Sequence, residues 1–120
     1  MTLQHVALET APRDRDALVR FFGLLGFAEV VPPTSLQGRT RWLQRGGLQL
    51  HLLFAEDPVA PPRGHVAIVE RDYEQALARL RAAGFEPDPR AEHWGAPRCF
   101  VVAPGGHRVE VMAAPPGAGA

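Results

Sequence analysis

Four side chains able to bind a metal ion recur at matching positions in the two halves of the chain. His5 opens the stretch His-Val-Ala-Leu, and His65 opens the similar His-Val-Ala-Ile 60 residues later. His51 and Glu110 are separated by a nearly equal 59 residues. Three imidazoles and one carboxylate suit one divalent transition metal ion such as Zn, Ni, Co, Mn or Fe. The repeat therefore favours a metal site at these four positions, although a lone strand histidine is more often a half-buried, hydrogen-bonded residue.

Few other residues offer chemistry. All 13 basic side chains are arginine, and without lysine there is neither a Schiff-base enzyme nor a P-loop phosphate clamp. The only serine, Ser35, follows Pro-Pro-Thr and lacks the turn that exposes a nucleophile. The only cysteine, Cys99, precedes an apolar run and is expected to be a buried strand residue. These absences point to a bound metal as the reactive centre.

The charge pattern restricts the partners. The 120 residues carry 13 acidic and 13 basic side chains, and the arginines are scattered, which argues against nucleic acid. No apolar run approaches the roughly 18 residues of a membrane span, and the first residues do not resemble a signal peptide. We expect a cytoplasmic protein with a small-molecule substrate and no membrane or nucleic-acid partner.

Hydrophobic spacing predicts the same order of elements in each half: strand, helix, strand, strand, strand. Gly26 and Gly84 are expected to end the helices, and Asp72 with Gln75 fits a capping box before the second helix. The first half is expected to contain strands at Leu3–Leu8, Phe27–Val31, Arg39–Gln44 and Leu48–Phe54, and a helix at Asp14–Leu25. The second is expected to contain strands at His65–Val69, near Phe85, at Arg98–Ala103 and at Arg108–Met112, and a helix at Tyr73–Ala83.

These elements predict an α+β domain over residues 1–113, built from two modules. The first module spans about 1–56, a proline-rich linker about 57–63, and the second module about 64–113. Residues 114–120, rich in Pro, Gly and Ala, are predicted to form a disordered tail.

Strand alternation assigns the predicted ligands to one surface. Side chains alternate between the two faces of a strand, so the aliphatic residues share one face, which is expected to carry the helices. The other faces are expected to form a concave surface with His5, His51, His65 and Glu110, and Gln49 shares a face with His51. His107 lacks this repeat support and is expected to be a turn or surface residue.

The motifs resemble the vicinal oxygen chelate superfamily, which includes glyoxalase I, extradiol dioxygenases, fosfomycin-resistance proteins, methylmalonyl-CoA epimerase and bleomycin-binding proteins. The resemblance covers residues 3–113. It implies two βαβββ modules forming a curved mixed sheet that encloses a metal-containing cleft, with the helices outside, and usually a homodimer. The segments that carry it are 3–8, 21–27, 64–68 and 104–111.

Position by position, His5 and His65 match the ligands that begin the first strand of each module, and Glu110 matches the carboxylate in the last strand. His51 falls where bacterial glyoxalase I has glutamate, so Glu110 alone is left for the catalytic role. The resemblance thus implies a metal-dependent lyase or isomerase in which Glu110 or a metal-bound water moves a proton. The substrate-binding residues expected to line the cleft are Gln49, Arg41, Trp94 and Arg98, although exposed strand or loop positions are equally compatible with the arginines and the tryptophan.

Two other activities stay open. His5, His65 and Glu110 satisfy the two-histidine, one-carboxylate set of non-haem iron oxygenases. However, the only tyrosine, Tyr73, is expected on the core face of a helix, so the acid–base tyrosine of typical extradiol dioxygenases is missing. The other alternative is a protein that binds a drug or another small molecule without catalysis, as the bleomycin-binding relatives do.

Overall fold

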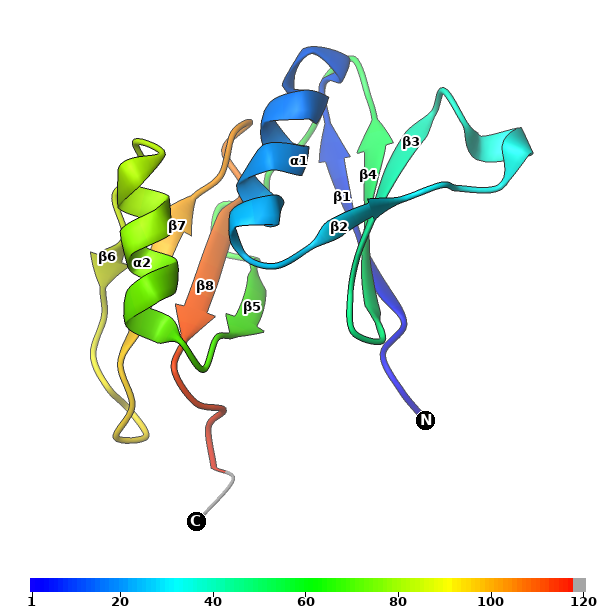
Figure 1. Cartoon of the computed structure of the whole chain (residues 1–120). Coiled ribbons are helices and arrows are strands. Elements are labelled where there is room, and N and C mark those ends of the chain that lie inside the picture. Colours follow the sequence, from blue (N-terminus) through cyan, green and yellow to red (C-terminus); the bar gives the residue numbers. More distant parts are fainter. Residues whose placement is uncertain (118–120) are drawn as a thin grey trace. The chain divides into compact units, whose positions relative to one another are not determined.

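Each half of the chain forms one four-stranded mixed sheet with one main helix (Figure 1). The computed structural model describes residues 1–117. The chain divides into two units, Met1–Ala60 (unit 1) and Pro61–Ala120 (unit 2), and the boundary falls inside the predicted linker. Two mixed sheets with few helices confirm the α+β class and the two βαβββ modules.

Unit 1 follows the expected order of elements, with strand boundaries shifted by at most two residues. Strand β1 pairs in parallel with β4, and the remaining pairs are antiparallel in the order β1-β4-β3-β2. The turn between β3 and β4 contains Gly46, whose φ of 57° suits glycine. The elements are β1 His5–Thr10, the short helix η1 Pro12–Asp14, α1 Arg15–Leu24, β2 Ala28–Val30, η2 Thr34–Leu36, β3 Thr40–Arg45 and β4 Leu48–Phe54.

Unit 2 repeats this topology in the order β5-β8-β7-β6, again with a parallel pair between its first and last strands. The strand expected near Phe85 lies instead at Asp88–Pro89, three residues further along the chain. Asp72 precedes the helix but makes no side-chain capping bond, so the capping-box prediction is wrong. The elements are β5 Val66–Val69, α2 Tyr73–Ala82, β6 Asp88–Pro89, β7 Arg98–Val102 and β8 Arg108–Met112.

Both helices end in the same way, as the repeat predicts. After α1, Gly26 has a φ of 87° and the Phe27 amide donates to the Phe22 carbonyl at 3.0 Å. After α2, Gly84 has a φ of 93° and the Phe85 amide donates to the Leu80 carbonyl at 3.0 Å. This backward bond across a left-handed glycine satisfies carbonyls that the helix leaves open.

The aliphatic faces of the strands and the apolar faces of the helices form the two cores. Cys99 is fully buried in β7, which confirms the predicted buried strand residue, and burial raises the pKa of its thiol. Tyr73 is buried on α2 as expected. His107, predicted to be a turn or surface residue, lies in the turn between β7 and β8 but is only 5% exposed. The most buried side chains are Leu18, Phe21, Phe22, Leu25, Leu43, Leu50 and Leu52 in unit 1, and Leu80, Cys99, Val101, Val109 and Val111 in unit 2.

Across residues 1–117, no helix is long and apolar enough to cross a membrane. At the start of the predicted tail, the Ala114 carbonyl accepts a hydrogen bond from the Trp94 indole at 2.9 Å. Residues 118–120 of that predicted tail lie outside the part of the chain that the structure describes.

Two glycines should respond in opposite ways to alanine. Gly23 is exposed within α1, and an added Cβ would meet no atom within 4 Å, so Gly23→Ala should stabilise the protein by about 0.5–1 kcal/mol. Gly84 is equally unobstructed but has a left-handed φ, so Gly84→Ala should cost about 1–2 kcal/mol. Urea unfolding of both variants measures the difference, and the same sign for both would contradict the helix-end assignment.

Candidate functional site

The parallel pair β1–β4 brings two predicted ligands together in unit 1. Ala7 lies opposite His51 in the register, and His5 shares the face of Ala7. The imidazole rings of His5 and His51 stack with their centroids 4.0 Å apart and their planes 14° apart. Leu50 and Leu52 point to the other face and are fully buried, so the predicted separation of polar and aliphatic faces is confirmed for this strand.

A residue that the sequence analysis missed covers the other side of His51. Trp42 lies opposite His51 in the antiparallel β3–β4 pair, and its indole stacks on the imidazole at 3.9 Å with an interplanar angle of 1°. The turn at Gly46 and Gly47 was the available signal, because it places residues 42 and 51 opposite each other. Among residues 1–117, the buried Trp42 Nε1 has no hydrogen-bond partner, which leaves a donor available to a ligand.

The electrostatics of this stack favour a neutral His51. Burial, and secondarily the charge of nearby His5, lower the pKa of His51. A neutral imidazole is the form that binds a metal ion. Burial of this histidine between two aromatic rings therefore keeps it in a protonation state suited to ligation.

Amide side chains orient both imidazoles of unit 1. His5 Nδ1 lies 2.7 Å from Gln4 Oε1, and His51 Nε2 lies 2.9 Å from Gln49 Oε1. An amide oxygen can only accept, so the ring nitrogen donates in each case. This leaves the lone pair of a neutral His5 on Nε2 and that of a neutral His51 on Nδ1. Gln49, a predicted substrate-binding residue, thus holds His51 in place through its side chain.

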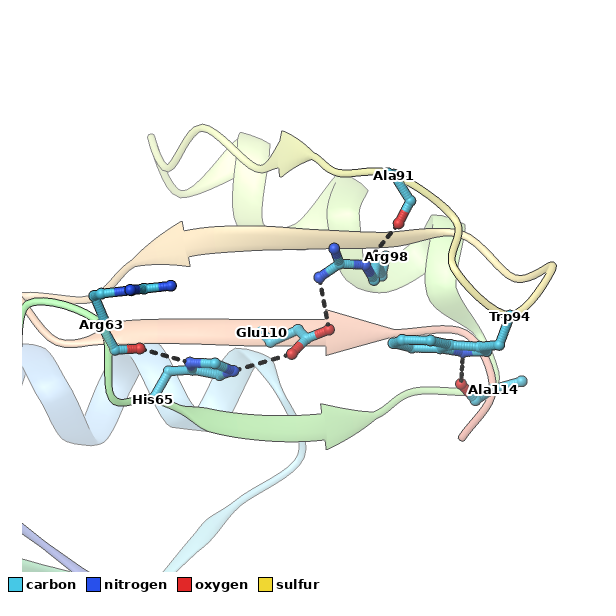
Figure 2. Close-up of polar contacts among 7 residues, drawn as sticks. All are labelled: Arg63, His65, Ala91, Trp94, Arg98, Glu110 and Ala114. Atoms are coloured by element: carbon cyan, nitrogen blue, oxygen red, sulfur yellow. Dashed lines mark hydrogen bonds and ion pairs between the residues drawn. The ribbon is translucent and has the colours of Figure 1, made fainter. Parts of the chain in front are cut away.

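The second parallel pair, β5–β8, brings the other two predicted ligands together in unit 2. Ala67 lies opposite Glu110, and His65 shares its face. His65 Nε2 is 3.1 Å from Glu110 Oε1, while His65 Nδ1 lies 2.9 Å from the Arg63 carbonyl oxygen (Figure 2). The carbonyl accepts only, so Nδ1 donates to it, and in a neutral ring the lone pair of Nε2 then faces a carboxylate oxygen. Two acceptors in this position require a proton or a cation between them.

The same pair passes a geometric test for a metal site. Ligand distances of about 2.0–2.2 Å at angles of about 90–110° place two donor atoms about 2.8–3.6 Å apart. The 3.1 Å separation between His65 Nε2 and Glu110 Oε1 lies in that range. Metal-binding histidines also commonly donate their second ring N–H to a backbone carbonyl, as His65 does to Arg63. His65 and Glu110 therefore fit a divalent ion that both would ligate.

Two predicted substrate-binding residues, Arg98 and Trp94, lie beside Glu110. Arg98 Nη1 donates to Glu110 Oε2 at 3.1 Å and Arg98 Nε to the Ala91 carbonyl at 2.7 Å (Figure 2). The Arg98 guanidinium also lies 5.6 Å from the centre of the Trp94 ring. Glu110 is 5% exposed, so its charge is held by a buried hydrogen bond to a cation.

The structure places the fourth predicted substrate-binding residue, Arg41, on the other face of its sheet. Arg41 lies opposite Leu52, points to the α1 side, and pairs with Glu29 at 2.7 Å and with Asp16 of α1 at 4.0 Å. It lines a cavity of about 400 Å³ together with Glu29 and Thr40. Arg41 is therefore separated from His51 by the sheet itself, because residues 41 and 42 point in opposite directions.

The four predicted ligands thus form two pairs, each within its own unit. His5 and His51 stack in unit 1, and His65 and Glu110 share a hydrogen bond in unit 2. Within residues 1–117, no three His, Cys, Asp or Glu side chains gather into a group that could hold a metal ion. The assignment of all four to one ion stays a prediction.

Comparison with known proteins gives one family. Residues 2–111 match the model of the Glyoxalase/Bleomycin resistance protein/Dioxygenase superfamily. No match to the chain was found among curated protein sequences.

Several solved structures share the fold. A glyoxalase family protein from Bacillus anthracis is 21% identical with a TM-score of 0.83, covering 93% of each chain. The oxidase ChaP-H2 is 22% identical with a TM-score of 0.78, covering 100% of this chain and 98% of its own. A lactoylglutathione lyase from Agrobacterium tumefaciens is 20% identical with a TM-score of 0.71, covering 92% of each chain. At identities of 20–22%, these similarities show a shared fold and nothing more specific.

The buried pair of Arg98 and Glu110 predicts strong energetic coupling. With a chelator present, Arg98→Met should cost about 3 kcal/mol, because it leaves a buried carboxylate without its cation. Glu110→Gln should cost a similar amount, and the double variant should cost less than the sum by about 1–3 kcal/mol. Denaturant unfolding of the four proteins closes the cycle. Additive losses would show that the contact contributes nothing to stability.

Proposed function

The chain belongs to the Glyoxalase/Bleomycin resistance protein/Dioxygenase superfamily, and we propose that it is a metal-dependent enzyme of the glyoxalase type, a lyase or isomerase acting on a small molecule. The observation that supports this most directly is the pairing of His65 Nε2 with Glu110 Oε1 at 3.1 Å. When His65 is neutral, Nε2 and Oε1 are both acceptors, and a divalent cation between them would satisfy both.

In this proposal His5, His51, His65 and Glu110 hold one divalent transition metal ion, Zn, Ni, Co, Mn or Fe. The lowered pKa of His51 favours its neutral, ligating form, whereas the near-parallel stack of His5 on His51 would have to open before both rings could bind one ion. His51 Nε2 donates to Gln49, so His51 has either to bind through Nδ1 or to exchange that hydrogen bond for the metal. When bound, the ion supplies a Lewis acid that stabilises negative charge developing on substrate oxygens.

Glu110 is the proton carrier. Arg98 occupies Oε2, so the proton taken from a carbon next to a substrate carbonyl, and returned to a neighbouring position, binds Oε1 through the lone pair that would not hold the ion. The proton taken equals the proton returned, so Glu110 is regenerated. His65 donates through Nδ1 to the Arg63 carbonyl and contacts Glu110 Oε1 through Nε2. It thereby fixes the side of the carboxylate that the substrate approaches.

The substrate is held by neighbouring side chains in the same proposal. Trp94 presents an apolar ring beside Arg98, and Gln49 acts through His51. The Trp42 indole N–H, buried beside His51 without a partner among residues 1–117, is available to a substrate oxygen. A homodimer, a cytoplasmic location and the absence of a nucleic-acid partner stay predictions.

Metal content tests the proposal directly. Protein purified without added metal should contain about one equivalent of a divalent transition metal, and adding Ni²⁺, Co²⁺, Zn²⁺ or Mn²⁺ to chelated protein should raise Tm, because an ion that binds only the folded state stabilises it. Turnover of an α-keto hemithioacetal should then depend on the ion and be lost in Glu110→Gln. Less than about 0.2 equivalents with no rise in Tm would count against a metalloenzyme and favour the non-catalytic binding protein.

A pair of variants tests the number of ligands. His51→Ala should weaken metal retention about as much as His65→Ala if both side chains bind the ion, a loss of at least about tenfold each. Equilibrium dialysis with a competing chelator measures it, with His93→Ala as a control outside the predicted set. Retention by His51→Ala equal to that of the wild type would contradict the four-ligand assignment and favour the three-ligand set of the dioxygenase alternative.

A further inference from the structure

Three guanidinium groups surround one aromatic ring on the Glu110 face of unit 2. Phe100 of β7 lies directly opposite Glu110 in the antiparallel β7–β8 register, so both side chains share a face. The distances from the Phe100 ring centre are 4.2 Å to Arg108, 5.3 Å to Arg90 and 5.9 Å to Arg98. The His65 ring meets the same ring edge-on at 4.8 Å. Cations are thus concentrated around the proposed proton carrier.

These cations differ in what neutralises them. Arg90 pairs with Asp88 at 3.0 Å, and Arg98 pairs with Glu110 at 3.1 Å. Arg108 is half-buried and forms no ion pair with a carboxylate within residues 1–117. Its guanidinium lies over the ring of Phe100. An aromatic face compensates only part of the cost of a partly desolvated charge. Arg108 therefore presents a guanidinium able to bind an anion with two N–H donors.

Arg63 adds to the excess of positive charge. Its carbonyl anchors His65, its side chain is exposed, and Figure 2 shows that side chain extending on the same side of the strands as the His65 ring. No ion pair of Arg63 is recorded within residues 1–117. On this face the acidic Glu110 is already paired with Arg98, so an incoming anion meets uncompensated cations rather than repulsion.

We propose that the substrate is an organic anion whose charged group, a carboxylate or a phosphate, binds Arg108 while its reacting oxygens lie at Glu110. This assignment rests on the proposed function of the same site. Arg108 precedes Glu110 by two residues on β8 and on the same face, so the two positions are about 7 Å apart along the strand. A molecule that satisfies both positions carries its anion on a short spacer from the oxygens that react.

Binding of three matched probes tests the proposal. Each carries a catechol as the vicinal oxygen pair; they are 3-(3,4-dihydroxyphenyl)propanoate, 2-(3,4-dihydroxyphenyl)ethyl phosphate and the neutral 3-(3,4-dihydroxyphenyl)propanamide. Calorimetry on the full chain, loaded with Zn²⁺, should give at least about tenfold tighter binding for one or both anions than for the amide. A preference confined to one anion identifies the charged group.

Substitutions assign that preference to Arg108. Arg108→Gln should reduce the ratio of anion to amide affinity to about one, and Arg108→Lys should retain part of it, because lysine keeps the charge but not the two-pronged geometry. Arg71→Gln, which removes an exposed arginine elsewhere in unit 2, should leave the ratio unchanged.

Two outcomes would overturn the proposal: equal affinity of the wild type for anions and amide, including no detectable binding of either, or an unchanged preference in Arg108→Gln. Zn²⁺ retention, measured in parallel, should be the same in Arg108→Gln and in the wild type. If Arg108→Gln loses the anion preference but retains zinc, the loss is assigned to Arg108. If the wild type fails to retain zinc, the result contradicts the proposed metalloenzyme instead.

Discussion

The register of the parallel strand pair in each unit is the constraint on which the candidate site depends. In unit 1 Ala7 of β1 lies opposite His51 of β4, and in unit 2 Ala67 of β5 lies opposite Glu110 of β8. These are equivalent positions of the internal repeat. Each pairing places the first-strand histidine next to the last-strand ligand. A shift of one residue would turn the second member of each pair toward the helix and the core. The aliphatic side chains that alternate with the ligands hold the register, because they have to face the helix.

The two units use this shared geometry for different electrostatic environments. In unit 1 an aromatic stack of His5, His51 and Trp42 encloses the second imidazole and lowers its pKa, so the neutral ligand form is favoured. In unit 2 the equivalent place holds a carboxylate, which needs a cation and has one in Arg98. Unit 1 has His51 where unit 2 has Glu110, so no carboxylate lies at that position of unit 1, while arginines surround the carboxylate of unit 2.

The arginines link the two proposals. Arg98 contacts one oxygen of Glu110 and His65 contacts the other, which is the oxygen proposed for proton transfer. Arg108, two residues along the same strand, has no such internal partner among the described residues, and so its charge is directed to a ligand. The 13 arginines of the chain are balanced by 13 acidic residues, so the formal net charge is zero. The placement of the arginines nevertheless gives this face of unit 2 a local excess of positive charge. Balanced composition and local charge are thus separate properties.

The sequence by itself determined the repeat, the order of elements, the helix-ending glycines and the face on which each strand ligand lies, because these follow from local spacing and the period of two along a strand. The repeat predicted these four residues as ligands, but their grouping into His5 with His51 and His65 with Glu110 came from the parallel pairing of β1 with β4 and of β5 with β8. Tertiary structure decided what local patterns do not encode. The partner strand β3 brought Trp42 onto His51, and ion pairs with Asp16 of α1 and Glu29 of β2 hold Arg41 on the helix side of its sheet. Each depends on which side chain a neighbouring element presents in space, and spacing along one chain segment carries no information about that neighbour.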